Sequence, residues 1–384
     1  MNKRLKKTVL ETFREKYPEQ PIFIFSPGRI NLIGEHTDYN DGFVFPAAIN
    51  KGIGLAIAKT NGKMSKAYAL DMKASFQFQV NKDIRPLENG GWKNYILGVV
   101  SEIQKMGCTF GNFNAVFAGN IPSGSGMSSS AALENAFVFG LNALFDLGLS
   151  RKEMIFISQK AEHHFAGVKC GIMDQYASMF GKKDSALLLD CRTIESTLYK
   201  IDFKDYKLML INSNVKHDLS ESAYNDRRNV CEMVSKKLQI EALRDATRNN
   251  LQNVRNSISK DDYDKALYVI EENQRVKAFS EAIKNNDLKV LGDLLYESHK
   301  GLSQKFKVSC AELDFLVEKT KGTDAVLGSR MMGGGFGGCT INIVKKSEYK
   351  QFKNMISDAF LKKFHRACSI YSVKLSEGTR IIEL

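Results

Sequence analysis

Residues 119–136, GNIPSGSGMSSSAALENA, decide the fold because they join an irregular loop to a helix. Pro122, Gly124 and Gly126 interrupt any regular element, whereas apolar residues recur at helical spacing over 133–145. Glycines let backbone N–H groups turn toward a ligand, and the first turn of a helix leaves four N–H groups free beside the positive end of the helix dipole. The stretch therefore predicts an anion site, and phosphate is the ligand that such a site typically binds.

Two common nucleotide loops are excluded by the same residues. A Walker loop needs Gly-x-x-x-x-Gly-Lys-Ser/Thr, but here Gly124 is followed by Ser125 and Gly126. The dinucleotide-binding pattern also fails, because Ser129 stands where its third glycine belongs. An ordinary loop capped by serine is a second interpretation. A nucleotide bound here is held by a different loop chemistry.

Length and composition favour an ordinary protein of two to three domains. The chain has 384 residues, of which 43% are hydrophobic, so conventional cores can form without disulfides. Its longest apolar runs fall far short of the ~20 residues that span a bilayer. The basic N-terminus continues into Glu11 and Arg14 without the apolar centre of a signal peptide. We therefore expect a cytoplasmic protein with no membrane partner.

The distribution of charge argues against a nucleic-acid-binding protein, and the spacing of cysteine and histidine argues against a zinc protein. The formal net charge is +12, but Lys and Arg lie among Asp and Glu along helical stretches rather than among aromatic residues in one stripe. The seven cysteines include no Cys-x-x-Cys pair, and the six histidines show no zinc spacing. We expect reduced cysteines and no nucleic-acid partner, although the charge favours an anionic substrate.

A second polar stretch is SPGRINLIGEHTDYNDG, residues 26–42. It follows a short strand predicted at 22–25 and precedes the apolar residues 43–45, which places its charged residues among turns. In one interpretation Asp and Asn cap turns, and Asp41-Gly42 makes a hairpin. In the other, carboxylate and imidazole groups reach into a cleft and hydrogen-bond a polyol.

Periodicity and turn signals predict the remaining elements. Glu162 lies beside the apolar face of a predicted helix and Asp174 in the first turns of another, so each is either structural or functional. The glycines of 328–340 indicate that the backbone approaches a second loop or a ligand closely. Helices are expected at 5–17, 94–106, from the Ser150 capping box to Gly167, at 171–180 and over 224–320 with breaks near 249, 261, 286 and 301; strands are expected near 52–59, 66–70, 75–80, 112–118, 186–190, 208–212 and 341–344.

Three of these stretches together resemble the galactokinases of the GHMP family of small-molecule kinases. Residues 28–39, GRINLIGEHTDY, resemble the galactokinase signature, residues 122–132 the ATP-binding loop, and residues 333–338 the third, glycine-rich motif. CGIMDQ at 170–175 and NSNVKH at 212–217 also match in type and position. The resemblance covers nearly the whole chain, and its motifs are in the right order.

The resemblance implies an α+β protein of two lobes with the active site between them. Residues 1–200 would form a mixed α/β lobe with a ribosomal-protein-like βαβ core, and residues 201–384 a ferredoxin-like lobe. The implied reaction is ATP-dependent phosphorylation of the anomeric hydroxyl of D-galactose, in galactose metabolism (the Leloir pathway). Mg²⁺ would be the cofactor, and the protein would be a monomer.

The resemblance also implies roles for individual residues. Asp174 would be the catalytic base, with Arg29 as its partner in the transition state. Asp38 would accept hydrogen bonds from the 3- and 4-hydroxyls of the sugar, while Glu35 and His36 would address the 6-hydroxyl. Thr37, Gly171 and Tyr224 would complete the sugar site; Gly124, Ser125, Gly126, Met127, Ser128, Ser129 and Ser130 would bind ATP; Ser130 and Glu162 would hold Mg²⁺.

Two other functions are compatible with these motifs. One is a kinase for N-acetylgalactosamine, and the other is a sensor that binds sugar and ATP and reports to a transcription partner. A sensor could lose catalytic groups or shorten the phosphate loop, whereas Arg29, Glu162, Asp174 and the run 128–132 are all present. Phosphoryl transfer needs positioning and charge neutralisation more than covalent chemistry, and these residue types supply both.

Overall fold

The computed structural model describes residues 2–80, 83–215 and 220–384. Its helices are α1 (Lys3–Lys16), α2 (Trp92–Lys105), α3 (Ser129–Phe145), α4 (Arg151–Ala161), α5 (Met173–Phe180), α6 (Ser220–Leu238), α7 (Arg248–Asn253), α8 (Lys260–Lys284), α9 (Leu288–Gln304), α10 (Ala311–Glu318) and α11 (Tyr349–Phe364). Its strands are β1 (Ile22–Asn31), β2 (Phe43–Val44), β3 (Pro46–Lys59), β4 (Ser65–Ala69), β5 (Ala74–Phe78), β6 (Phe113–Gly119), β7 (Ser185–Asp190), β8 (Glu195–Lys200), β9 (Tyr206–Asn212), β10 (Val326–Met332), β11 (Cys339–Lys345), β12 (Ser369–Ser372) and β13 (Arg380–Ile381).

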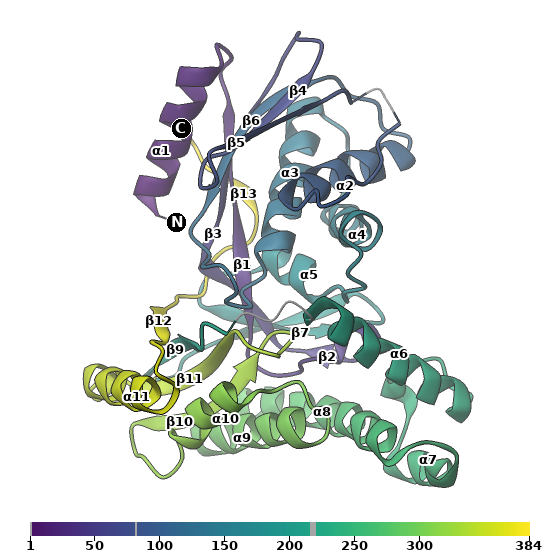
Figure 1. The fold of residues 1–384 in the computed structure, drawn as a ribbon, viewed down its shortest axis with the longest axis vertical. Coiled ribbons are helices and arrows are strands. Elements are labelled where there is room, and N and C mark those ends of the chain that lie inside the picture. Colours follow the sequence, from purple (N-terminus) through teal and green to yellow (C-terminus); the bar gives the residue numbers. More distant parts are fainter. Residues whose placement is uncertain (1, 81–82, 216–219) are drawn as a thin grey trace.

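Figure 1 shows two lobes stacked along the longest axis, as expected. The upper lobe contains a six-stranded sheet in the order β13-β1-β3-β6-β4-β5, in which only β4 and β6 pair in parallel. Helix α1 covers one face with Val9, Leu10 and Phe13, and α2 to α5 lie on the other side. The boundary at residue 200 between the two lobes stays a prediction.

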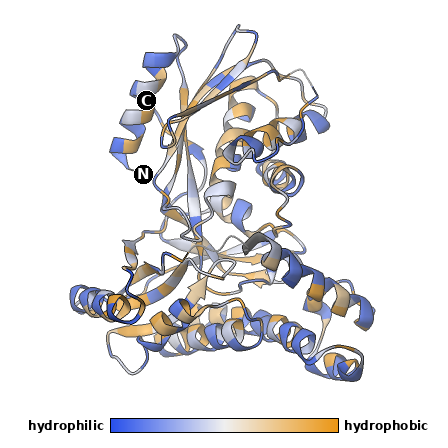
Figure 2. Cartoon of the chain, in the orientation of Figure 1, coloured by the Kyte–Doolittle hydropathy of each residue, from blue (hydrophilic) through white to orange (hydrophobic). Residues whose placement is uncertain are grey.

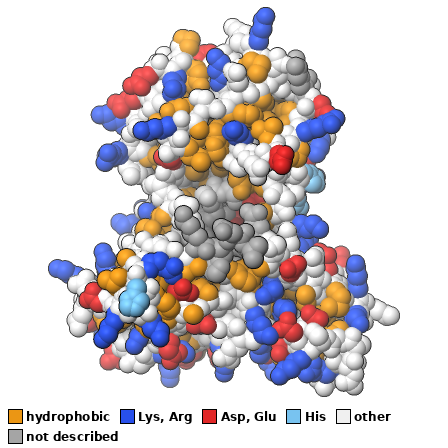
Figure 3. All heavy atoms as spheres, in the orientation of Figure 1, with side chains coloured by type: hydrophobic (Ala, Val, Ile, Leu, Met, Phe, Trp, Pro, Cys, Tyr) orange, Lys and Arg blue, Asp and Glu red, His pale blue; other side chains and the backbone are white. Residues whose placement is uncertain are grey.

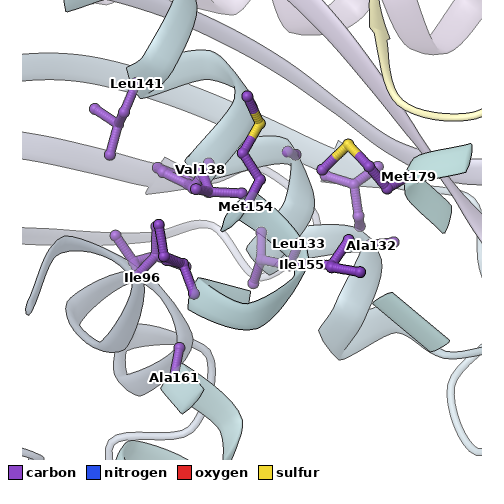
Figure 4. Packing of buried hydrophobic residues seen from close by; sticks show 14 of the residues in the cluster. Ile96, Ala132, Leu133, Val138, Leu141, Met154, Ile155, Ala161 and Met179 are labelled. Carbon is purple, nitrogen blue, oxygen red and sulfur yellow. The ribbon is translucent and has the colours of Figure 1, made fainter. Parts of the chain in front are cut away.

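The upper core forms where α2, α3, α4 and α5 meet. Figure 4 shows Ile96, Leu133, Ile155 and Met179 packed together there, each at most 5% exposed. Burying one such side chain stabilises the fold by about 1.5–3 kcal/mol. Figure 2 shows hydrophilic residues on the outward faces of many of the helices. This packing fixes α3 and α5, whose N-terminal ends carry the predicted site residues.

The lower lobe is built on a four-stranded antiparallel sheet, β10-β11-β9-β12. Helix α9 packs against β10, and α8 packs against α9 (Figure 1). A core that includes Leu32 and Phe45 as well as Leu210 and Ile341 joins this sheet to the end of β1. The last strand, β13, then returns to the upper sheet and pairs with β1. The lobes are therefore connected by a shared hydrophobic core as well as by the chain.

No helix within the described ranges has the length and apolar character to cross a bilayer. On the face shown in Figure 3, basic side chains lie among acidic ones over both lobes. The seven cysteines are free thiols, as expected.

The prediction that residues 26–29 lie in a loop is wrong, because β1 continues from Ile22 to Asn31. The register of β1 against β3 shifts between Pro27 and Arg29, and the Arg29 N–H donates to the Met127 carbonyl oxygen at 3.1 Å. A Cβ atom at Gly28 would lie 2.4 Å from that oxygen, so only glycine fits. The bulge therefore brings Arg29 directly onto the loop before α3.

One glycine prediction fails for a related reason. The break expected near Gly301 is absent from α9, which runs to Gln304; a Cβ atom at Gly301 would lie 2.7 Å from the Tyr268 ring, so this glycine permits packing. In the stretch 328–340, the first residues belong to β10, and the loop is confined to 333–338. A close approach in three dimensions, rather than chain flexibility, explains glycine at these positions.

Candidate active site

A cavity of about 130 Å³ lies where the lobes meet, and seven of the predicted site residues line it. The β1–β2 loop, the end of α4, the start of α5, helix α6 and the glycine-rich loop all contribute to its wall. The lining residues are Arg29, Glu35, His36, Asp38, Glu162, Val168, Cys170, Met173, Asp174, Tyr224, Gly333 and Gly334.

Arg29 and Asp174 form a two-pronged ion pair in this cavity. Arg29 Nε donates to Asp174 Oδ1 and Arg29 Nη2 donates to Oδ2, both at 2.7 Å. The Ser128 hydroxyl donates to the same Oδ2 at 2.6 Å, and Arg29 Nη1 donates to the Gly126 carbonyl oxygen. Charge-assisted, bidentate contacts of this kind fix geometry as well as adding energy. One guanidinium therefore ties the carboxylate to the loop before α3.

Residues 124–130 have the geometry that an anion site needs. Gly124, Gly126 and Ser128 have φ angles of 64°, 67° and 59°, so the backbone repeatedly enters the left-handed region. The loop opens the 17-residue helix α3, whose first N–H groups have no partners within the helix. The serine-cap interpretation is wrong, because Ser128 makes no side-chain cap bond and its hydroxyl contacts Asp174. The assignment of ATP to this loop stays a prediction.

The second glycine-rich loop, residues 333–338, packs directly on the first. A Cβ atom at Gly333 would lie 3.4 Å from the Gly126 Cα, and one at Gly338 would lie 3.6 Å from the Gly124 carbonyl oxygen. Both Gly333 and Gly338 also have positive φ angles. Approach to a second loop is thus one of the two explanations left open by the sequence, and the structure shows it.

Glu35 holds this second loop in place. Its Oε1 accepts a hydrogen bond from the Gly333 N–H at 2.8 Å and one from Arg330 Nη2 at 3.1 Å. Arg330 is fully buried and also donates to the carbonyl oxygens of Asn31 and Leu32. Both of these contacts use Oε1, so among the described residues Oε2 is the oxygen left to accept from a ligand. Glu35 therefore belongs to a buried clamp between the lobes.

His36 is neutral, and both of its ring nitrogens are engaged. Burial lowers the pKa of His36 to about 3. The neutral ring accepts from the Tyr39 hydroxyl at Nδ1 (2.8 Å) and donates from Nε2 to the Gly334 carbonyl oxygen (3.2 Å). Its ring lies 5.3 Å from that of Tyr224 and 4.9 Å from that of Phe306, measured between centroids. In this arrangement His36 lines the cavity with its ring and steadies the glycine-rich loop.

Thr37 and Gly171 lie beside the cavity rather than in its wall. The Thr37 hydroxyl is buried and lies within hydrogen-bond distance of two carbonyl oxygens, 2.6 Å from that of Phe43 and 2.9 Å from that of Gly34. A Cβ atom at Gly171 would lie 2.1 Å from Asp38 Oδ2, so glycine is required for that carboxylate to take its place. Both residues therefore shape the loop around Asp38.

Asp38 and Glu162 are buried carboxylates whose pKa values are shifted toward the protonated form in the free protein. Burial raises the pKa of Asp38 to about 7, and the charge of Asp174 adds to the rise. Burial and Asp174 likewise raise the pKa of Glu162, against hydrogen bonds from the Ser130 and Cys170 side chains. A ligand that donates hydrogen bonds, or a cation, would favour the ionised forms.

The oxygens around Glu162 suit Mg²⁺. The Ser130 hydroxyl and the Glu162 carboxylate contact each other, and Glu134, one turn along α3 from Ser130, is fully buried with one oxygen unpartnered among the described atoms. Over the ranges that the structure covers, no group of three His, Cys, Asp or Glu side chains could bind a metal alone. Mg²⁺ needs no such group, because it takes one or two protein carboxylates and completes its shell with water and phosphate.

Sequence reasoning gave no role to Arg330, Gln175 or Glu134. A charged residue inside the otherwise apolar and small-residue strand β10 was the available signal for Arg330. Gln175 follows Asp174 in the chain, but its contact with Glu162 depends on how α5 packs against α4. Lys216 and His217, the last two residues of the run matched at 212–217, lie outside the described residues.

The bidentate pair of Arg29 and Asp174 lies beside a loop with the geometry of an anion site. A small-molecule kinase needs such an arrangement, and the comparisons with known proteins point to the same class. The family model "GHMP kinases N terminal domain" matches residues 94–182, and the family model "GHMP kinases C terminal" matches residues 279–362. The "Galactokinase galactose-binding signature" matches residues 11–59.

Relatives that match over nearly the whole chain identify the kind of GHMP kinase. The chain is 38% identical to the galactokinase of Thermotoga maritima over 93% of its own length and 99% of that protein. It is 40% identical to the galactokinase of Clostridium acetobutylicum, covering 93% and 94% of the two chains. The chain therefore belongs to the galactokinases, within the GHMP kinase family, and the resemblance seen in the sequence is confirmed.

Solved structures confirm the fold. The structure of Lactococcus lactis galactokinase complexed with galactose superposes with a TM-score of 0.93 at 32% identity, covering 98% of this chain and 99% of that one. The mevalonate kinase of Methanococcus jannaschii shares the fold at a TM-score of 0.66 and 19% identity, covering 94% of this chain and all of that one. The expected α+β GHMP kinase fold is thus correct.

The clamp predicts a stability effect of Glu35 that a residue contacting only substrate would not have. Glu35→Ala should lower the free energy of unfolding of the unliganded protein by about 3–5 kcal/mol, because it leaves the Arg330 guanidinium buried and unpaired. Chemical denaturation measures this change. Combining it with Arg330→Met should recover a large part of the loss.

A matched control for this experiment is Glu281→Ala, which removes an exposed pair with Lys284 and should cost no more than about 0.5 kcal/mol. A cost for Glu35→Ala no larger than that of the control would contradict the clamp.

The raised pKa of Asp38 predicts a pH-dependent stability. The pKa is about 7 in the folded protein against the ordinary 3.8, so between these values the folded state binds more protons than the unfolded state. Stability contributed by this group is therefore lost as pH rises through that window, by at most about 1.4 kcal/mol per pH unit. Asp38→Asn should gain stability relative to the parent protein as pH rises, measured by denaturation from about pH 5 to about pH 8. A difference that does not change with pH would contradict the assignment.

Proposed function

We propose that the protein transfers the γ-phosphoryl group of ATP to the anomeric hydroxyl of D-galactose, giving galactose 1-phosphate and ADP. The observation that carries the proposal is the junction of Arg29, Asp174 and Ser128, which places a carboxylate between the polar cavity and the loop before α3. An acceptor for a hydroxyl proton and a cradle for phosphate thereby lie side by side.

The nucleotide phosphates bind to the loop of residues 124–130. Its left-handed backbone and the free N–H groups at the start of α3 supply donors for the phosphate oxygens. Met127 is fully buried and fixes the loop from within, while the glycine-rich loop 333–338 supports it from the lower lobe. The loop is thus organised before the nucleotide arrives, which removes an ordering cost from binding.

Asp174 accepts the proton of the anomeric hydroxyl. Two contacts from Arg29 and one from Ser128 hold the carboxylate in a single orientation, as a positioned base requires. Arg29 also faces the charge that develops on the transferred group. Positioning and charge neutralisation therefore account for most of what phosphoryl transfer needs.

Ser130 and Glu162 would hold Mg²⁺, with remaining ligands from phosphate and water. When bound, the ion neutralises phosphate charge and orients the phosphates. Glu162, ionised by the cation, and the Ser130 hydroxyl at the first turn of α3 face the same position.

The sugar occupies the cavity between the lobes. Asp38 accepts from the 3- and 4-hydroxyls, and Glu35 Oε2 accepts from the 6-hydroxyl. His36, also expected at the 6-hydroxyl, has both ring nitrogens engaged by Tyr39 and Gly334 and contributes its ring instead. Tyr224 and the ring of His36 form the wall, while Thr37 and Gly171 fix the loop that carries Asp38. The protein works as a monomer in the cytoplasm, and its free thiols support a reducing compartment.

A panel of sugars in a coupled ADP-release assay tests the substrate. Galactose and glucose differ in the direction of the 4-hydroxyl, and glucose would leave the buried Asp38 short of a donor. An unpaired buried acceptor costs about 1–3 kcal/mol and more when it is charged, and sites built around a substrate hydroxyl can discriminate by up to about 10⁴–10⁵, so kcat/KM should favour galactose by at least about 10³. Asp38→Ala should reduce this ratio as well as galactose turnover.

Other outcomes of the panel identify the alternatives. Turnover of N-acetylgalactosamine as fast as galactose would favour that kinase, and binding of both sugar and ATP without any turnover would favour a sensor. Equal use of glucose would refute the sugar assignment.

A double-mutant cycle tests the chemistry. Asp174→Asn should lower kcat by about 10² to 10⁴, the range for a positioned base, with the fold intact by circular dichroism. Adding Arg29→Ala should cost less activation free energy than the sum of the two single changes, because the two groups act as a unit. Additive losses would show that the residues work independently.

A further inference from the structure

Gln175 lies next to Asp174 on α5, yet its side chain contacts a different part of the site. It is fully buried, and its Nε2 donates to Glu162 Oε2 at 2.9 Å. The same nitrogen lies 3.5 Å from Glu134 Oε2 and 3.8 Å from the Cys170 sulfur. A single amide group thus stands between two buried carboxylates.

The position of Glu162 needs such a partner. It is the first residue of a π-helical turn, Glu162–Ala166, so it sits where α4 loses its regular hydrogen bonding. Ser130 and Glu134 are one turn apart on α3 and both face Glu162. The Ser130 and Cys170 side chains also contact the Glu162 carboxylate, and Glu134, whose pKa burial raises, lies against it, so the amide of Gln175 adds a fixed donor between the two carboxyl groups.

Two buried oxygens near Glu162 have no hydrogen-bond partner among the residues that the structure describes. They are Gln175 Oε1 and Glu134 Oε1, and both residues are 0% exposed. Buried polar atoms are nearly always satisfied, so two exceptions beside one carboxylate point to a missing bound species that can offer donors. Water molecules around a metal ion would supply them.

We propose that Gln175 is a positioning residue that holds the Glu162 carboxylate in the orientation in which it binds Mg²⁺. The amide occupies one lone pair of Oε2 and so fixes the direction in which the carboxylate presents its other lone pairs. This inference rests on the proposed function, in which Glu162 is a ligand of Mg²⁺. Outer-shell partners of this kind typically set metal affinity by 10- to 100-fold.

The test is the affinity of a non-hydrolysable ATP analogue, AMP-PNP, measured by isothermal titration calorimetry with Mg²⁺ and with EDTA. Gln175→Met keeps the length of the side chain and removes the amide. The gain in affinity that Mg²⁺ gives should fall about 10- to 100-fold, while the affinity in EDTA stays unchanged. Gln175→Asn, which keeps an amide but is one methylene shorter, should shift the gain in the same direction and serves if the first variant folds poorly.

Ser178→Ala is the matched control. Ser178 is a buried polar residue one turn further along α5, and its hydroxyl contacts Ser26 rather than Glu162. The control should keep the full Mg²⁺-dependent gain. If Gln175→Met lowered affinity equally with Mg²⁺ and with EDTA, its role would be structural and the proposal overturned.

Glu162→Gln separates this proposal from the one it rests on. Suppose that Glu162→Gln loses the Mg²⁺-dependent gain in AMP-PNP affinity but neither Gln175 variant does. The positioning role of Gln175 would then be overturned, while Glu162 would remain a ligand of Mg²⁺. Retention of the full gain in Glu162→Gln would remove Glu162 as a ligand, and the positioning role with it.

Discussion

One buried guanidinium, Arg29, interacts with four carboxylates, and the active site depends on this imbalance. It makes a bidentate ion pair with Asp174, and its charge also acts on Glu35, Asp38 and Glu162. Burial raises the pKa of Asp38 and Glu162, and the charge of Asp174 adds to the rise, so the free cavity holds more acceptors than its own cations can satisfy. A polyol supplies hydroxyl donors to one carboxylate, and a divalent cation supplies charge to another. The same imbalance therefore favours both substrates of a sugar kinase.

A second buried guanidinium, Arg330, connects the two lobes to this site. It pairs with Glu35 and donates to the carbonyl oxygens at the end of β1, while Glu35 also holds the Gly333 N–H. Because Gly333 packs on Gly126, the sugar-side clamp also supports the phosphate loop. Buried ion pairs contribute little net stability, but breaking one is costly, so such a pair fixes the relative position of the parts it joins.

Most helices and strands could be predicted from periodicity and caps, and the Ser150 capping box at the start of α4 is present as expected. The failures share one cause, which is close approach between segments distant in sequence. Gly28 lies within β1, where a side chain would clash with the Met127 carbonyl oxygen. Gly301 lies within α9, where a side chain would clash with the Tyr268 ring. Gln175 acquires its role only when α5 packs beside Glu162. Local sequence shows which residue types are present, but not which backbone or carboxylate they will meet.

The most direct measurement is a crystal structure with galactose and AMP-PNP bound together. We expect the anomeric oxygen to lie within about 2.6–3.2 Å of an Asp174 oxygen, with Arg29 still paired to that carboxylate through two nitrogens and the γ-phosphate against residues 124–130. An anomeric oxygen turned away from Asp174, with another side chain in contact with it, would show that phosphoryl transfer does not take place at the junction of Arg29, Asp174 and Ser128.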